Sequence, residues 1–244
     1  MTSRQVTVTG IVLQRRDWME SDRLLTLMTK EQGKLEVIAR GARRSHSHLA
    51  ASTEPFVLGE MHLAKGKLKN YLTQTRIQST FPEIRKDYVR LSAAVALGEL
   101  NHAFTLYHQS SPEIFNLFAL TLSFLEHHPN PLVVLVWSGL KLMELEGVHP
   151  NWIHCNVKGT PVSERLAWVS PSMGGYVSDV VAQSCFDRYQ VPIEVLIGLA
   201  KTSECKNPPQ NLKLAKDCLR TLSVIWKELT HMSLPALENI LALP

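Results

Sequence analysis

Basic side chains gathered in the first third of the chain are the clearest candidates for a binding site. Lys65, Lys67 and Lys69 alternate along one polar segment, and Tyr71 follows them. The other members of this set are arginines: Arg15, Arg16, Arg40, Arg43 and Arg44. Long cations neutralise phosphates and release counterions, which gives affinity independent of sequence, and a neighbouring aromatic ring can stack on a base. The set therefore predicts a surface that binds a phosphate polymer.

The pattern alone also allows a simpler interpretation. In it, Tyr71 belongs to the barrel core and the cations only face solvent. The distribution of charge favours the first interpretation. Residues 1–90 hold 16 Lys or Arg against 9 Asp or Glu, a net charge of +7, although the whole chain carries only +4. A basic first third on a slightly acidic remainder suggests that the first part meets a polyanion.

Catalytic motifs are not found in the sequence. Neither Gly41-Ala42-Arg43 nor Gly66-Lys67-Leu68 has the glycine, lysine and hydroxyl spacing of a P-loop, and there is no nucleophile elbow and no H-E-x-x-H pair. A metal-assisted nuclease needs clustered carboxylates, whereas Asp17, Glu20 and Asp22 are scattered. We therefore expect a binding protein with no catalytic residue, and not an enzyme.

A metal site is weighed at His149, His154 and Cys155, which fall within seven positions. Imidazole and thiolate suit zinc, but no fourth ligand stands at a normal spacing. The cysteines, at positions 155, 185, 205 and 218, form no C-x-x-C pair. We expect reduced thiols, no bound metal and no cofactor.

The elements that must position the basic residues are short strands in residues 1–80. Strand-like runs joined by polar or glycine-containing turns cover Thr7–Leu13, Leu24–Thr29, Leu35–Ala39, Phe56–Ala64 and Tyr71–Thr80. Five such strands suit a small closed barrel, either an OB-fold or an SH3-like barrel, and spacing separates the two only weakly.

Residues 81–244 predict an all-α domain, so the fold class is α+β. Helix starts are expected at Pro82, Ser111-Pro112, Asn130-Pro131, Pro192 and Asn211, and Ser233 is expected to cap a final short helix. Residues 148–190 are rich in turn formers and predict an irregular insertion. The apolar run Pro131–Leu145 is too short and polar to span a bilayer, and the first residues lack a signal pattern, so a cytoplasmic protein is expected.

Several segments together resemble the bacterial RecO family. They are Thr9–Leu13, Glu20–Leu27, Gly33-Lys34-Leu35, Ala39–Arg44, Glu144–Pro150 and Gly174–Val177. No single segment is very specific, but their joint order and spacing are, and they cover most of the chain.

The resemblance implies a DNA repair and recombination mediator of the RecF pathway with an N-terminal OB-fold and a helical C-terminal domain. Such a protein binds single- and double-stranded DNA, anneals complementary strands and, with RecR, helps RecA load onto DNA coated by single-strand binding protein. It contacts the tail of that last protein. It acts in the cytoplasm at the nucleoid, with no membrane partner.

The chain departs from the family pattern at its zinc motif, where many members have two C-x-x-C pairs. Cys155 matches the first ligand position, but Lys158, Ser178 and Val181 stand at the other three. A closed tetrahedral site needs four donors, so the resemblance implies a degenerate zinc-finger-like region without zinc. We expect packing by Trp152, Trp168 and Tyr176 to hold this region.

Two further hypotheses keep the barrel but change its ligand. In one the barrel binds RNA, which a strong preference for the 2′-hydroxyl would indicate. In the other the chain is a scaffold that binds only protein, which a failure to bind any oligonucleotide at low salt would indicate.

Overall fold

The computed structural model describes residues 5–163 and 165–243. The prediction that the first residues lack a signal pattern therefore falls partly outside the described residues. The chain divides into two compact units. Unit 1 contains Met1–Asp87 and Asn101–Glu126, and unit 2 contains Tyr88–Leu100 and His127–Pro244. A domain boundary between residues 80 and 81 stays a prediction.

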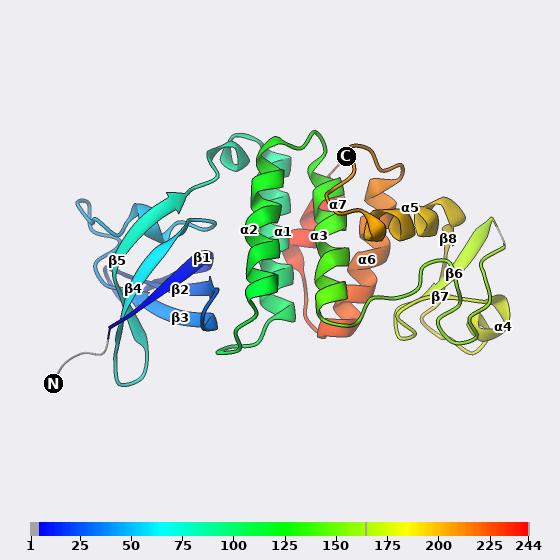
Figure 1. Cartoon of the computed structure of the whole chain (residues 1–244), viewed down its shortest axis with the longest axis horizontal. Helices are drawn as coiled ribbons and strands as arrows, with labels where there is room; N and C mark the ends of the chain where they lie inside the picture. The colour runs from blue at the N-terminus through cyan, green and yellow to red at the C-terminus, as the bar shows by residue number, and fades with distance from the viewer. Residues whose placement is uncertain (1–4, 164, 244) are drawn as a thin grey trace. The chain divides into compact units, whose positions relative to one another are not determined.

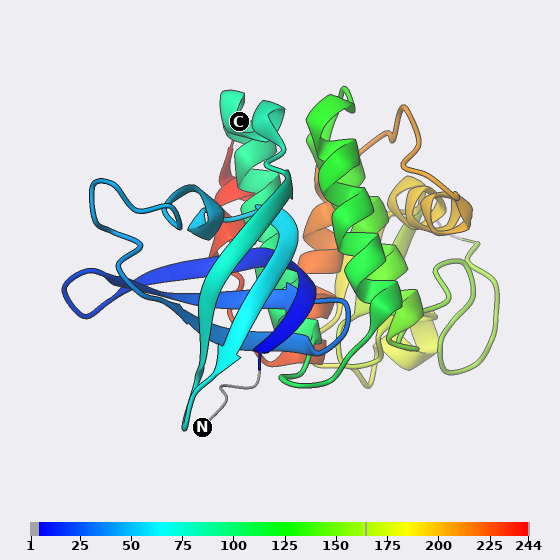
Figure 2. The same ribbon diagram turned by 60° about the vertical axis from the view of Figure 1, so that its left-hand side comes forward.

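Unit 1 contains a closed five-stranded barrel with the strand order β1-β2-β3-β5-β4, which Figures 1 and 2 show from two sides. All neighbouring strands are antiparallel except β3 and β5, which are parallel, and β1 pairs with both β2 and β4. This arrangement is that of an OB-fold and decides between the two predicted barrels. The strands are β1 Gln5–Trp18, β2 Asp22–Thr29, β3 Gly33–Ala39, β4 Leu58–Lys65 and β5 Asn70–Ser79.

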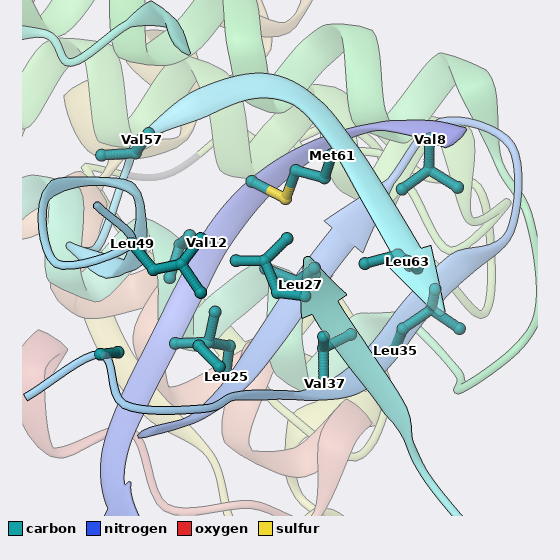
Figure 3. Packing of buried hydrophobic residues seen from close by; sticks show 13 residues of the cluster. Val8, Val12, Leu25, Leu27, Leu35, Val37, Leu49, Val57, Met61 and Leu63 are labelled. Carbon is teal, nitrogen blue, oxygen red and sulfur yellow. The ribbon is translucent and has the colours of Figure 1, made fainter. Parts of the chain in front are cut away.

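The barrel core follows from alternation along the strands. Leu25 of β2 lies opposite Val37 of β3, and Leu27 lies opposite Leu35, and all of these side chains are buried inside the barrel (Figure 3). The residues between them must point outward, because side chains alternate along a strand. An irregularity between Val12 and Gln14 shifts the register of β1 against β2, and the strand bends where such a bulge occurs.

Two short 3-10 helices interrupt the connections: η1 Ala51–Thr53 lies between β3 and β4, and η2 Pro82–Lys86 follows β5. The helix expected to begin at Pro82 instead begins after η2, as α1 Tyr88–Phe104. The helix α2 Pro112–His127 starts where it was predicted. The helix α3 Pro131–Leu145 also starts as predicted, because the Asn130 side chain accepts a hydrogen bond from the Leu132 N–H at 3.0 Å.

The helices of unit 2 include α5 Ile193–Glu204, α6 Ala215–Thr230 and α7 Pro235–Ala242. Helices α3 and α6 pack closely at Gly139. A Cβ atom added at this glycine would stand only 2.0 Å from Cζ2 of Trp226, so no larger residue fits there without a shift. The prediction that Ser233 caps the last helix is wrong. Leu234 is the N-cap residue and no side chain caps that end, because Pro235 already fixes the backbone of the first turn.

The insertion at residues 148–190 is more regular than predicted. It contributes to an antiparallel sheet of order β7-β6-β8, formed by β6 Leu166–Ser170, β7 Gly175–Val177 and β8 Tyr189–Pro192, together with the short helix α4 Asp179–Ala182. Trp152 and Tyr176 are buried, as expected. Trp168 is half-buried, and the Arg188 guanidinium lies 5.5 Å from its ring centroid.

No helix in the described part of the chain has the length and apolar character needed to cross a membrane.

Candidate nucleic-acid interface

The outer face of β1, β2 and β3 collects polar and aromatic side chains in register. Gln14 lies opposite Thr26, and Thr26 lies opposite Glu36. Arg16 and Trp18 follow Gln14 at two-residue intervals on the same strand, so they share its face. This part of unit 1 is called the strand face below, and Glu36 lies within it.

Glu36 forms ion pairs with two members of the predicted basic set. Its Oε1 lies 3.5 Å from Nη2 of Arg16, and its Oε2 contacts Nζ of Lys69. The Arg16 side chain is 65% exposed, whereas those of Glu36 and Lys69 are 32% and 30% exposed. Ion pairs this accessible to solvent are worth about 0.2–1 kcal/mol each, so a phosphate group can compete with Glu36 for both cations.

Trp18 is the aromatic residue of the strand face. The Arg16 guanidinium carbon and the Lys69 ammonium each lie 5.8 Å from its ring centroid. The indole is half-buried at the end of β1. In proteins that bind single strands, aromatic rings near cations serve such a role, because bases stack on the rings while phosphates meet the charges.

Two hollows adjoin the strand face and share Glu36 and Tyr107 in their linings. One, of about 540 Å³, is lined by Glu36, residues 65–70, Tyr107 and His108. The other, of about 230 Å³, is lined by Gln14, Arg15, Arg16, Leu24, Thr26, Glu36, His102 and Tyr107. The basic β4–β5 loop and the arginines at the end of β1 thus belong to one surface of unit 1.

Tyr107 rests on the buried side chain of Lys34. The Lys34 ammonium lies 4.5 Å from the Tyr107 ring centroid and donates to the His102 carbonyl at 2.6 Å. Desolvation lowers the pKa of Lys34, and desolvation together with the Lys34 charge lowers the pKa of His102. Tyr107 as a whole residue remains 44% exposed, so this packing holds one side of the ring and still leaves part of the residue open to a ligand.

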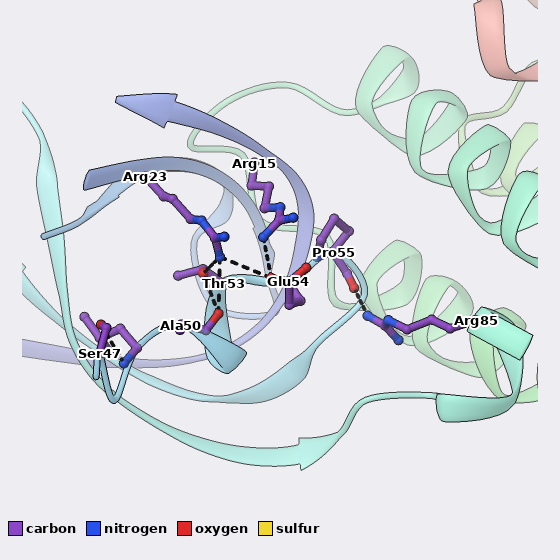
Figure 4. Close-up of polar contacts among 9 residues, drawn as sticks. Arg15, Arg23, Ser47, Ala50, Thr53, Glu54, Pro55 and Arg85 are labelled. Atoms are coloured by element: carbon purple, nitrogen blue, oxygen red, sulfur yellow. Dashed lines mark hydrogen bonds and ion pairs between the residues drawn. The ribbon is translucent and has the colours of Figure 1, made fainter. Parts of the chain in front are cut away.

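Arg15 does not project freely from the barrel, although the sequence analysis placed it in the basic set. Its guanidinium pairs with the Glu54 carboxylate, which also accepts from Arg23 at 3.2 Å (Figure 4). Arg23 in turn donates to the Thr53 hydroxyl at 2.6 Å. Arg85 donates to the carbonyl of Pro55 in the same loop. These contacts hold the loop before β4 against the end of β1, so Arg15 has a structural role there.

Arg40 and Tyr71 pack against each other, with the guanidinium 4.2 Å from the ring centroid. A Cβ added at Gly66 would stand 2.5 Å from the Tyr71 ring, so the ring also lies against the backbone of the β4–β5 loop. Tyr71 is neither a core residue nor a free stacking surface. Arg43 pairs with Asp17 at 3.3 Å, and Arg44 lines a separate hollow with Arg40.

The predicted basic set is therefore divided. Arg16, Lys65, Lys67 and Lys69 surround the strand face and its larger hollow, whereas the arginines of the 40–48 loop line another hollow. Arg15, Arg16, Arg43 and Lys69 pair with acidic side chains. Among the ion pairs of the described residues, none involves Arg40, Arg44, Lys65 or Lys67.

Sequence reasoning missed Trp18, Glu36 and Tyr107. The Arg16-Asp17-Trp18 spacing could have indicated Trp18, because residues two apart on a strand share a face. Glu36 and Tyr107 gave no comparable signal, since their positions depend on strand pairing and on the return of residues 101–126 to unit 1.

The degenerate zinc region contains no group of three or more His, Cys, Asp or Glu side chains that could hold a metal ion among the described residues. His149, His154 and Cys185 therefore do not join Cys155 in a site. The N–H groups of Lys158 and Ser178 donate to the Cys155 sulfur at 3.5 and 3.3 Å. Burial acts to raise the pKa of this thiol, but these hydrogen bonds outweigh it and lower the pKa.

A closed five-stranded OB-type barrel, followed by helices and a small three-stranded sheet, defines the structural class of this chain. Comparison with known families places the chain within that class. The family described as "Recombination protein O N terminal" matches residues 1–81, and "Recombination protein O C terminal" matches residues 85–196. The chain belongs to the RecO family of DNA repair proteins, which are recombination mediators and not enzymes.

Individual relatives agree with this assignment. A DNA repair protein RecO of Gloeobacter violaceus is 30% identical over 218 residues, covering 87% of this chain and 82% of the relative. One of Desulfitobacterium hafniense is 35% identical over 168 residues, covering 69% of this chain and 61% of the relative. One of Synechococcus elongatus is 36% identical over 188 residues, covering 74% of this chain and 71% of the relative.

Proposed function

We propose that this RecO-family protein binds single- and double-stranded DNA through the strand face and the β4–β5 loop of its barrel. The observation that carries the proposal is the placement of Lys65 and Lys67. Both are exposed and line the larger hollow beside Glu36 and Tyr107. Neither belongs to the ion pairs found in the described part of the chain. The exposed end of β4 and the loop that follows it need no such charges for packing, whereas binding to a phosphate backbone requires positive charges.

The ion pairs of the strand face limit which of the predicted cations can contact phosphates directly. Arg16 and Lys69 must leave Glu36 to meet phosphates, and the small energy of exposed pairs permits the exchange. Arg15 and Arg43 are tied to Glu54 and Asp17, so we propose only secondary roles for them. Arg40 and Arg44 line the separate hollow of the 40–48 loop, with Tyr71 of β5 packed against Arg40, and we propose that they form a second patch for phosphates.

The wider activity is proposed on the basis of family membership. A cationic barrel that holds two strands and screens their repulsion would anneal complementary DNA. With RecR, the protein would help RecA load onto DNA covered by single-strand binding protein, whose tail it would contact. These partners are proposals that rest on the resemblance, and binding assays with each purified protein test them.

The deciding experiment is an anisotropy titration of a labelled single-stranded oligonucleotide at several salt concentrations. Lys65→Ala with Lys67→Ala should weaken binding and reduce the slope of log K against log salt by up to about 1.4, because each lost phosphate contact on a single strand contributes about 0.7. A matched control changes Lys206 and Lys213, two exposed lysines of unit 2.

An unchanged salt slope in the Lys65 and Lys67 variant, or equal losses in both double variants, would refute the proposed surface. Binding of a matched RNA oligomer much more tightly than DNA would support the RNA hypothesis instead. Absence of binding to either nucleic acid at low salt would leave the protein-only scaffold.

A further inference from the structure

The strand face carries two aromatic residues that electrostatic recognition of phosphate does not require. Trp18 lies at the end of β1 with the Arg16 and Lys69 cations near its ring, and Tyr107 lines both hollows. Both rings belong to unit 1. Large aromatic side chains normally bury their area, and a polar face that keeps two of them partly open offers stacking surface to a ligand.

We propose that Trp18 and Tyr107 are base-stacking residues that give this surface a preference for unpaired bases. The inference rests on the proposed function and deepens it by naming the part of the nucleic acid that is recognised. Phosphate contacts alone give no preference for unpaired bases, because a duplex presents phosphates at least as densely as a single strand. Stacking gives that preference, because only an unpaired strand offers its base faces to an aromatic ring.

The geometry around Trp18 supports this role. Each cation lies 5.8 Å from the ring centroid and also pairs with Glu36. When a phosphate draws Arg16 and Lys69 to itself, the main chain of Trp18 stays paired with Asp22 at the end of β1, and the half-buried indole remains beside the two cations. A nucleotide presents a base beside each phosphate, which matches an aromatic ring flanked by cations.

The geometry around Tyr107 supports the same role by different contacts. One side of the ring faces the Lys34 ammonium, which is held by the His102 carbonyl. The His102 ring stands edge-on to Tyr107, with centroids 6.2 Å apart. The ring is therefore positioned before any ligand arrives, which reduces the entropy lost on binding. Its exposed part opens to the hollows that Lys65, Lys67 and Arg16 also line.

The test compares an oligothymidine strand with an abasic strand of the same length, which keeps every phosphate but lacks the bases. The wild-type protein should bind the oligothymidine more tightly. Trp18→Ala and Tyr107→Ala should each lose about 5- to 150-fold in affinity for oligothymidine. Neither should change affinity for the abasic strand or the slope against salt. Trp18→Phe and Tyr107→Phe keep a ring and should retain most of the preference.

Thermal melting of each full-length variant checks that the substitutions leave the fold intact. A base preference equal to that of wild type in either alanine variant overturns the assignment of that residue. Equal losses on the abasic strand would also overturn it, because they indicate a change in the cations. The proposed function fails by a different result, namely no binding of wild type to any of the strands at low salt.

Discussion

Neutralising Glu36 should strengthen DNA binding, although it removes contacts seen in the folded protein. Glu36 is the acidic residue that pairs with both Arg16 and Lys69 on the strand face. Before phosphate can bind, these pairs must open. Glu36→Gln keeps the shape of the side chain but removes the charge that holds the cations, so both become available to phosphate.

The magnitude follows from the exposure of the pairs. With side chains of Glu36 and Lys69 about one-third exposed and Arg16 more so, each pair is worth about 0.2–1 kcal/mol. Removing two such competing pairs should tighten binding by about 0.4–2 kcal/mol, or about 2- to 30-fold. The free energy of unfolding should fall by no more than a similar amount.

The assay is anisotropy with a labelled single strand at low and moderate salt. Glu60→Gln is the matched control, because it removes the same charge from the barrel, where Glu60 pairs only weakly with His62 at 3.6 Å. The gain in affinity should be larger for Glu36→Gln than for the control. Weaker binding by Glu36→Gln, or an equal gain in both variants, would refute the role given to the strand face.

Three further predictions concern stability and thiol chemistry. Gly139→Ala should lower the free energy of unfolding by about 1–3 kcal/mol in a urea titration, because the added methyl group collides with the Trp226 ring; an unchanged midpoint would contradict this packing. Of the four free cysteines only Cys205 is not buried, so Ellman's reagent should titrate one thiol rapidly in the native protein and four in denaturant. Burial lowers the pKa of His102 and of His149, so the unfolded chain takes up protons first and stability should fall as pH drops below about 6.5. Replacing both histidines by Gln should flatten that part of the stability profile, and an equally steep profile in the variant would count against this cause.

The sequence predicted the barrel well because its strands alternate and its turns carry clear signals. Gly33, the first residue of β3 directly after the β2–β3 turn, takes a positive φ of 68°, a conformation that glycine adopts easily. Asn130-Pro131 likewise predicted the start of α3, where the Asn130 side chain caps the helix. Local chemistry decides such features, so local reasoning finds them.

Other features depend on contacts between distant segments and could not be predicted. Strands β6 to β8 have only five, three and four residues among turn formers, so their pairing gives no sequence period to detect. The DNA-binding role of the basic set stays a prediction, and the pairing of Arg15 with Glu54 and of Arg43 with Asp17 depends on tertiary structure that the sequence pattern does not reveal. The same holds for Tyr107, which lies beyond the strands and was not predicted to line their surface.

The interleaving of the two compact units affects how this protein can be dissected. Residues 88–100 belong to unit 2, whereas residues 101–126 return to unit 1. A recombinant fragment that stops after Asp87 would lack Tyr107, and Lys34 would lose the His102 carbonyl that accepts its hydrogen bond. If Tyr107 stacks on bases as proposed, such a fragment would bind single-stranded DNA more weakly than the intact chain does. A chimera between two relatives would need to carry residues 101–126 together with the strands.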